Sequence, residues 1–130
     1  MSSDVLLQYK GMADVLFAVV LAAKPDVIYS SVPVRLASYI TGLPLFDADV
    51  APAFNQALAC LTATFGVGHI VASRQGPAAR PAFYYMNVTY ALLSFFTCIL
   101  PSSTDVGSAY LLVLSLAHAA FAFLLYVTDF

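Results

Sequence analysis

The feature that most constrains the fold is a 23-residue stretch at 51–73 that contains no Asp, Glu, Lys or Arg. At about 1.5 Å of rise per residue, a helix of this length reaches about 34 Å, enough to cross a hydrocarbon layer of about 30 Å. We therefore predict a transmembrane helix at 51–73.

Small and polar residues gather on one face of this predicted helix. Small and hydrogen-bonding groups gain most from contact with other helices, and an imidazole inside a membrane needs a partner. We therefore expect this face to pack against other helices and not against lipid. Read at spacings of three and four, the face consists of Asn55, Ala59, Thr62, Gly66, His69 and Ser73.

The composition of the whole chain is that of a membrane protein. The 130 residues are 62% hydrophobic and 9% charged, with a mean hydropathy of +0.88, whereas soluble domains are about 45–50% apolar and about 25% charged. The net charge of -2 leaves no basic stripe, so nucleic acid is not an expected partner. Cys60 and Cys98 lie in apolar stretches without metal-ligand spacing, which predicts free thiols and no structural zinc.

Three further spans are predicted, at 5–23, 81–100 and 108–130. The first contains Lys10 and Asp14, four residues apart, and its charge pattern is a poor match to a cleavable signal, so we expect this span to be retained. It is either a full span with ionisable residues inside it or a shorter helix that begins in the interface. Asp14 either pairs with Lys10 or belongs to a polar site within the bundle.

The connections complete an all-α, up-down four-helix transmembrane bundle that forms one domain, 1–130, with both termini on one side. Short turns are predicted at 74–80 and 101–108. The long connection at 24–50 is too interrupted by proline and Asp to span. Its middle, at 34–43, has the spacing of an amphipathic helix in the headgroup region, which either anchors the surface or acts as a lid over a site.

Polar residues of all four spans fall in the same half of the membrane. Counted from the terminus-side ends, His69 lies about 6 Å deep, Asn87 about 9 Å, Asp14 and Tyr90 about 13 Å, and His118 about 18 Å. A shared internal site is therefore expected. Its acid–base candidates are Asp14, His69 and His118, and the residues expected to orient substrate or water are Tyr84, Asn87 and Tyr90.

Each of these residues also has a structural interpretation. A histidine on such a face often serves as an interhelical hydrogen-bond partner, and membrane tyrosines often form interfacial belts. His69 and His118 lie on separate spans and belong to no HxxxH or ExxH pair, so we expect no metal site. No other cofactor is expected either.

The absence of several catalytic motifs limits the types of reaction that this chain is expected to catalyse. There is no GxSxG, P-loop or dinucleotide fingerprint. What remains is acid–base work, with Asp14 or a histidine as the base toward a water or hydroxyl and a tyrosine or protonated histidine as the acid toward a leaving oxygen. Such groups suit the opening of an epoxide, or the isomerisation or cyclisation of a lipophilic polyene.

Three segments, together with chain size and four spans, carry a resemblance to a known group: FGVGHIVASRQGP (65–77), YYMNVTYALLS (84–94) and LSLAHAAFAF (114–123). The pattern resembles the small four-span membrane epoxide hydrolases and epoxide-opening cyclases of fungal polyketide clusters, of the aurovertin and citreoviridin type. It implies an enzyme of secondary metabolism in the endoplasmic reticulum that acts on a lipophilic polyketide-type epoxide. The resemblance is one of overall pattern and assigns no residue a role. Four-span sterol isomerase-like proteins are a second comparison, weakened by the absence of tryptophan.

Two other functions stay open at this point. The chain is alternatively a non-catalytic small subunit or assembly factor of a larger membrane complex, whose polar faces bind partner helices. A transporter or channel component is the third class. The expected partners are a lipophilic small molecule and membrane lipids, with a homodimer as the expected assembly if the chain self-associates.

Overall fold

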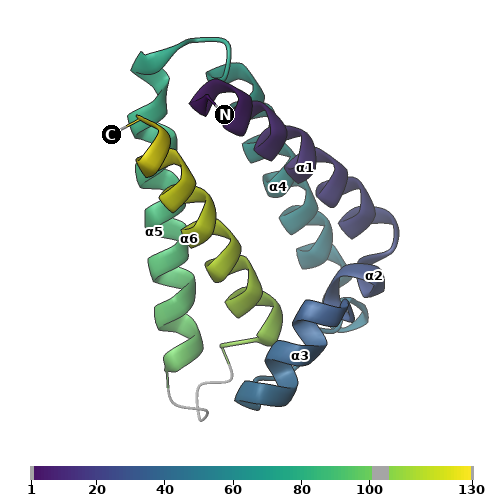
Figure 1. The fold of residues 1–130 in the computed structure, drawn as a ribbon. Coiled ribbons are helices and arrows are strands. Elements are labelled where there is room, and N and C mark those ends of the chain that lie inside the picture. The colour runs from purple at the N-terminus through teal and green to yellow at the C-terminus, as the bar shows by residue number, and fades with distance from the viewer. Residues whose placement is uncertain (1, 101–105, 130) are drawn as a thin grey trace.

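The computed structural model describes residues 2–100 and 106–129 (Figure 1). All regular secondary structure in these residues is helical, which confirms the predicted all-α fold. The ends of the four long helices lie within two residues of the predicted span ends, and the predicted turn at 101–108 falls largely outside the described residues. The helices are α1 (Ser3–Ala23), α2 (Pro25–Tyr29), α3 (Val32–Thr41), η1 (Ala48–Val50), α4 (Pro52–Ala72), η2 (Pro77–Ala79), α5 (Arg80–Ile99) and α6 (Ala109–Asp129).

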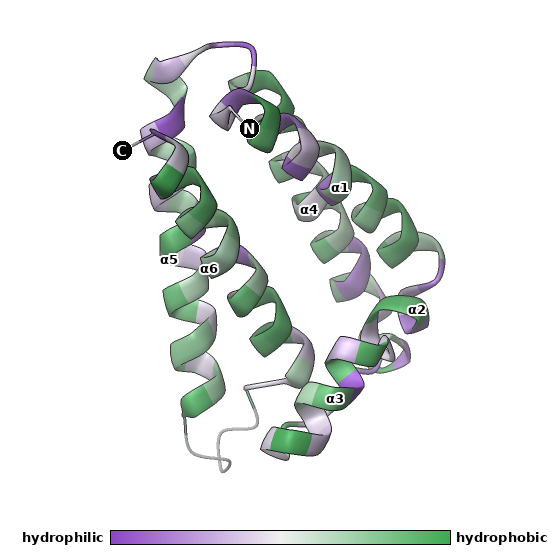
Figure 2. Ribbon diagram, in the orientation of Figure 1, coloured by the Kyte–Doolittle hydropathy of each residue, from purple (hydrophilic) through white to green (hydrophobic). Residues whose placement is uncertain are grey.

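The four long helices make this a multi-pass membrane protein. Each is long and apolar enough to cross a membrane, with a mean hydropathy between 1.2 and 2.1 over its most apolar window. Large apolar side chains such as Leu16, Leu93 and Phe123 are about two-thirds exposed, as expected for groups that face lipid. Hydrophobic positions cover most of the four helices in Figure 2. The N- and C-terminal ends lie at the same end of the bundle, as predicted (Figure 1).

The bundle consists of two antiparallel helix pairs. Helix α1 packs along α4, and α5 packs along α6, whereas the two pairs touch each other much less (Figure 1). The short helices α2 and α3 follow α1, and α3 packs against α6 at the end of the bundle opposite the termini. The pairs are therefore the rigid units of the fold, and the space between them is where a site can form.

Glycines set the spacing of α1 and α4. A Cβ atom on Gly11 would lie 2.5 Å from the carbonyl oxygen of Gly66, and one on Gly66 would lie 2.8 Å from the carbonyl oxygen of Gly11. The two backbones are thus in direct contact, as small residues allow in membranes. The small and polar face predicted on the 51–73 helix packs inside the chain, since Asn55, Ala59 and His69 are also buried.

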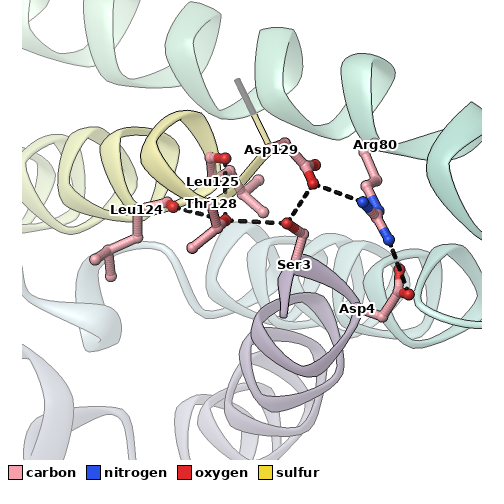
Figure 3. A network of polar contacts seen from close by, with 7 residues as sticks. All are labelled: Ser3, Asp4, Arg80, Leu124, Leu125, Thr128 and Asp129. Carbon is pink, nitrogen blue, oxygen red and sulfur yellow. Dashed lines mark hydrogen bonds and ion pairs between the residues drawn. The ribbon is translucent and has the colours of Figure 1, made fainter. Parts of the chain in front are cut away.

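An ionic network joins the two pairs at the terminus end (Figure 3). Arg80 on α5 donates to both carboxylate oxygens of Asp4 on α1, at 3.1 and 2.9 Å, and to Asp129 on α6 at 2.6 Å. The Ser3 hydroxyl also donates to Asp129 and lies 3.0 Å from the hydroxyl of Thr128. One guanidinium therefore connects three helices through bidentate and charge-assisted bonds.

Replacing Arg80 with methionine is expected to lower the midpoint of thermal unfolding by several degrees. The variant leaves the Asp4 and Asp129 carboxylates facing each other without their shared cation. Circular dichroism of the detergent-purified protein measures the change. Arg74→Met is the matched control, because Arg74 is exposed and makes no ion pair within the described residues. Equal midpoints for the two variants would show that the network does not join the pairs.

At the opposite end, Tyr29 closes the bundle. Its hydroxyl is buried and donates to Oδ1 of Asn55 at 2.7 Å, and the Asn55 amide donates to the Leu21 carbonyl at 3.0 Å. The Tyr29 ring lies 4.6 Å from that of Phe46 and 4.8 Å from that of Tyr110. Burial raises the pKa of Tyr29 from 10.0 to about 12. The α1–α2 turn is thereby fixed to the start of α4.

The amphipathic helix predicted at 34–43 is confirmed as α3. The helix ends at Gly42, whose left-handed backbone (φ 75°) suits glycine. Val34 is buried in the bundle, whereas Tyr39 and Ile40 are exposed. These outward apolar side chains are those that a helix lying in the headgroup region would present to lipid.

Tyr29→Phe is expected to destabilise the protein by about 1–3 kcal/mol, because Asn55 Oδ1 loses its buried donor. Wild type should also lose stability as the pH rises from 10 toward 12, since the unfolded chain releases the phenol proton in this range while folded Tyr29 retains it. Denaturant unfolding at several pH values checks both effects, and the variant should lack this part of the alkaline loss. The control is Tyr39→Phe, at a residue that is 88% exposed. An unchanged alkaline profile for Tyr29→Phe would contradict the assignment.

Candidate active site

A cavity of about 360 Å³ lies between the two helix pairs and is lined by all four long helices. Its volume is in the range that holds small-molecule ligands. Polar groups converge at one part of the wall, and most of the remaining lining is apolar. The principal apolar residues are Phe17, Leu58, Leu61, Phe65, Met86 and Leu114.

Asn87 on α5 is the centre of the polar wall. It is fully buried, and its amide nitrogen donates to the Phe83 carbonyl at 2.8 Å and lies 3.2 Å from Nε2 of His69. Its Oδ1 lies 2.7 Å from Nδ1 of His118. A single side chain therefore links the imidazole of α4 to the imidazole of α6.

This network determines which nitrogen carries each proton. His69 Nδ1 lies 2.8 Å from the Phe65 carbonyl, which can only accept, so Nδ1 carries the hydrogen. In neutral His69, Nε2 then accepts from the Asn87 amide, and Asn87 Oδ1 accepts from Nδ1–H of His118. In neutral His118, Nε2 is consequently the nitrogen with the free lone pair.

His118 is the imidazole that α6 contributes to the cavity lining. Its ring packs against the ring of Tyr90 with the centroids 4.4 Å apart, and both residues line the cavity. Within the described residues, no hydrogen bond to Nε2 of His118 is present. The imidazole is thus held by Asn87 on one side and by Tyr90 across its face, with its basic atom uncommitted. A base oriented by a second group is the usual arrangement for proton abstraction.

The sequence left open whether Asp14 pairs with Lys10 or belongs to a polar site, and in the structure it does both. Its Oδ1 pairs with the ammonium of Lys10, and its Oδ2 lies 3.5 Å from Nδ1 of His69. Lys10 also lies over the ring of Phe121, with Nζ 5.7 Å from the ring centroid, and it lines the cavity. The carboxylate therefore holds an ammonium at the edge of the polar wall. Sequence reasoning treated Lys10 only as a partner of Asp14 and missed its place in the cavity.

The structure brings five of the six sequence candidates to this cavity and leaves out Tyr84. Tyr84 and Tyr90 lie three residues before and after Asn87, so their side chains lie about 60° to either side of it on α5, and of the two only Tyr90 lines this cavity. Tyr84 packs beside Tyr85 and Tyr126 and lines a separate groove formed by α5 and α6. The expectation that Tyr84 orients the substrate together with Asn87 does not fit this placement.

Tyr110 is a cavity residue that the sequence did not reveal. It is 5% exposed, and within the described residues its hydroxyl is the buried side-chain polar atom without a hydrogen-bond partner. Leaving a buried hydroxyl unpaired costs about 1–3 kcal/mol. A tyrosine near the start of a span is normally interpreted as part of an interfacial belt, so no local signal marks this one as buried.

The polar wall is suited to moving protons. Within residues 2–100 and 106–129, no three His, Cys, Asp or Glu side chains gather in a metal-binding arrangement. The wall offers an uncommitted imidazole nitrogen on His118, an ammonium on Lys10 and the carboxylate of Asp14. Comparisons with known protein families, with curated proteins and with solved structures find no match to this chain.

Proposed function

We propose that the protein is a membrane-embedded acid–base enzyme that opens epoxides of a lipophilic substrate, by hydrolysis or by cyclisation. One observation carries the proposal: the hydrogen bond to Asn87 holds a proton on Nδ1 of His118, which leaves the lone pair of Nε2 free in neutral His118, and His118 lines an apolar cavity. A base held in this way contributes about 10²–10⁴-fold to a proton-transfer step. The proposed location, the endoplasmic reticulum, and the polyketide-type substrate rest on the resemblance described above.

The apolar wall supports a lipid-soluble substrate. The cavity lies between transmembrane helices, and a compound dissolved in the bilayer is already concentrated beside them. The hydrocarbon part of the substrate would contact side chains such as Leu58, Leu61 and Leu114. Its epoxide would lie against the polar wall, the part of the lining that supplies proton donors and acceptors.

In the proposed reaction, His118 Nε2 removes a proton from the attacking oxygen. That oxygen belongs to water in hydrolysis and to a hydroxyl of the substrate in cyclisation. It forms a bond to one epoxide carbon as the carbon–oxygen bond of the ring breaks. The positive charge that develops on His118 is stabilised by its Nδ1–H bond to Asn87 Oδ1.

The Lys10 ammonium is the proposed proton donor to the epoxide oxygen. Asp14 holds it at the cavity, so the donor is in place before the ring opens. After the reaction, the proton on His118 returns to the Lys10 amine through water or the product hydroxyl, and the enzyme regains its starting state. Hydrolysis thus adds one water, and cyclisation rearranges the substrate without a change in mass.

The packing of the small-residue faces weighs against the non-catalytic alternative. A subunit that binds partner helices through these faces needs them on its surface. Ala59 is 4% exposed and Gly66 is buried, both against helices of the same chain. Enlarging these residues would therefore disturb the fold itself and would not report on a partner.

The test is product analysis with protein in lipid nanodiscs and a panel of long-chain epoxides, with and without a hydroxyl positioned for cyclisation. Incubation in oxygen-18 water should give labelled diols, or cyclic ethers of unchanged mass, with wild type. The control is the Asp14→Asn, His118→Ala double variant, which should give neither above the rate without protein. Equal products from wild type and the double variant, or none from either, would overturn the proposal.

A further inference from the structure

The unpaired hydroxyl of Tyr110 marks a second polar position in the cavity. The ring is fixed on two sides, stacked against Phe17 with centroids 6.4 Å apart and edge-on to Tyr29 at 4.8 Å. The Tyr29 hydroxyl already donates to Asn55 and is not a partner for Tyr110. The buried cluster around the ring also includes Leu21 and Ala59, and the Tyr90 phenol lies close enough to act on the Tyr110 phenol electrostatically. The hydroxyl is therefore a donor held in place without an acceptor.

Tyr110 lies apart from His118 along α6. Tyr110 precedes His118 by eight residues on α6, which places their backbones about 12 Å apart along the helix axis. Leu114 lies between them on the cavity side of the same helix. Along α6, the cavity lining thus passes from His118 through the apolar Leu114 to Tyr110.

We propose that Tyr110 is a specificity-determining residue that donates a hydrogen bond to an acceptor on the substrate, a carbonyl or ether oxygen. The substrate is then an elongated lipophile with its reacting group at the His118 end and this acceptor toward the Tyr110 end. An unpaired buried donor favours a ligand that supplies the missing acceptor over one that does not. The nature of the reacting group rests on the proposed function, whereas the site at Tyr110 does not.

The test is a binding measurement that needs no turnover. The probe is a long-chain ketone with a terminal hydroxyl and a carbon-13-labelled carbonyl, added at saturation to protein in nanodiscs. Isotope-edited infrared difference spectra report whether the carbonyl accepts a hydrogen bond, because its stretching frequency then falls. Wild type should show the lowered frequency. Tyr110→Phe should show the frequency of a carbonyl in apolar surroundings and bind the probe about tenfold more weakly.

Two controls separate a direct bond from a general disturbance. Tyr39→Phe removes a hydroxyl that is exposed on α3 and should behave as wild type. The saturated long-chain alcohol without the carbonyl should bind wild type and Tyr110→Phe with equal affinity. An unchanged carbonyl frequency in wild type, or a lowered frequency that persists in Tyr110→Phe, would overturn the assignment. A protein that passes this test but opens no epoxide would retain the Tyr110 site and lose only the proposed reaction.

Discussion

Replacing His118 with alanine is expected to lower kcat for epoxide opening by about 10²–10⁴-fold, because the only step it removes is proton abstraction by Nε2. The residue is half-buried at the cavity, and its loss leaves Asn87 Oδ1 without this donor, which costs about 1–3 kcal/mol, so the fold should persist with a lower unfolding midpoint. Steady-state rates in nanodiscs give the loss in kcat and KM. Circular dichroism checks that helix content is retained at the assay temperature.

Added imidazole supplies the control for this prediction. The truncated side chain leaves room next to Asn87, and a free imidazole that binds there should restore part of the lost rate. Asn87→Leu is the companion variant. It keeps the His118 imidazole but removes the acceptor that keeps the proton on Nδ1, so kcat should fall by about 10–100-fold and should not respond to imidazole. A His118→Ala variant with the wild-type rate would refute the catalytic assignment.

Replacing Gly66 with leucine is expected to destabilise the protein by at least about 3 kcal/mol. A Cβ at this position already meets the Gly11 carbonyl oxygen at 2.8 Å and the Val15 nitrogen at 2.9 Å, and neither backbone atom can rotate away. Overpacking of a core costs about 1–3 kcal/mol even where side chains can adjust. Helices α1 and α4 must therefore separate, which also displaces His69, one turn further along α4, from Asp14.

Gly68→Ala is the matched control on the same helix. A Cβ there would lie 3.5 Å from the Phe83 ring, an ordinary contact, and alanine should favour the helix by about 0.5–1 kcal/mol. Unfolding in mixed detergent, followed by circular dichroism, compares the two variants with wild type. Equal stability of Gly66→Leu and Gly68→Ala would show that the backbones do not meet at this crossing.

The sequence correctly predicted which face of the helix at 51–73 packs against other helices. The face predicted on the 51–73 helix packs inside the chain at Asn55, Ala59, Gly66 and His69, since small and polar side chains repeat with the helical period. The depths counted from the sequence separated Asn87 from His118 by about 9 Å. Their side chains nevertheless lie 2.7 Å apart, and Asn87 also contacts His69, so the three residues form a continuous hydrogen-bonded chain.

The rotation of each helix about its own axis could not be predicted from the sequence. Tyr84 and Tyr90 were both predicted to orient the substrate or water, yet of the two only Tyr90 lines the cavity. Tyr110 was not among the sequence candidates, and it is enclosed because α3 packs against α6 and Tyr29 of α2 packs against its ring. Arg80 looked like part of a hydrophilic turn and joins three helices instead.

The sequence by itself determined that this chain forms four transmembrane helices and which of their faces are small and polar. These properties are local, because lipid requires every span to satisfy its own backbone hydrogen bonds. Only the tertiary structure decided that the faces enclose a cavity, that Asn87 leaves His118 Nε2 free, and that Tyr110 lacks a partner. Those outcomes depend on how the helices rotate against each other. Long-range contacts set this rotation, such as Gly11 with Gly66 within one helix pair and Arg80 with Asp4 between the two pairs.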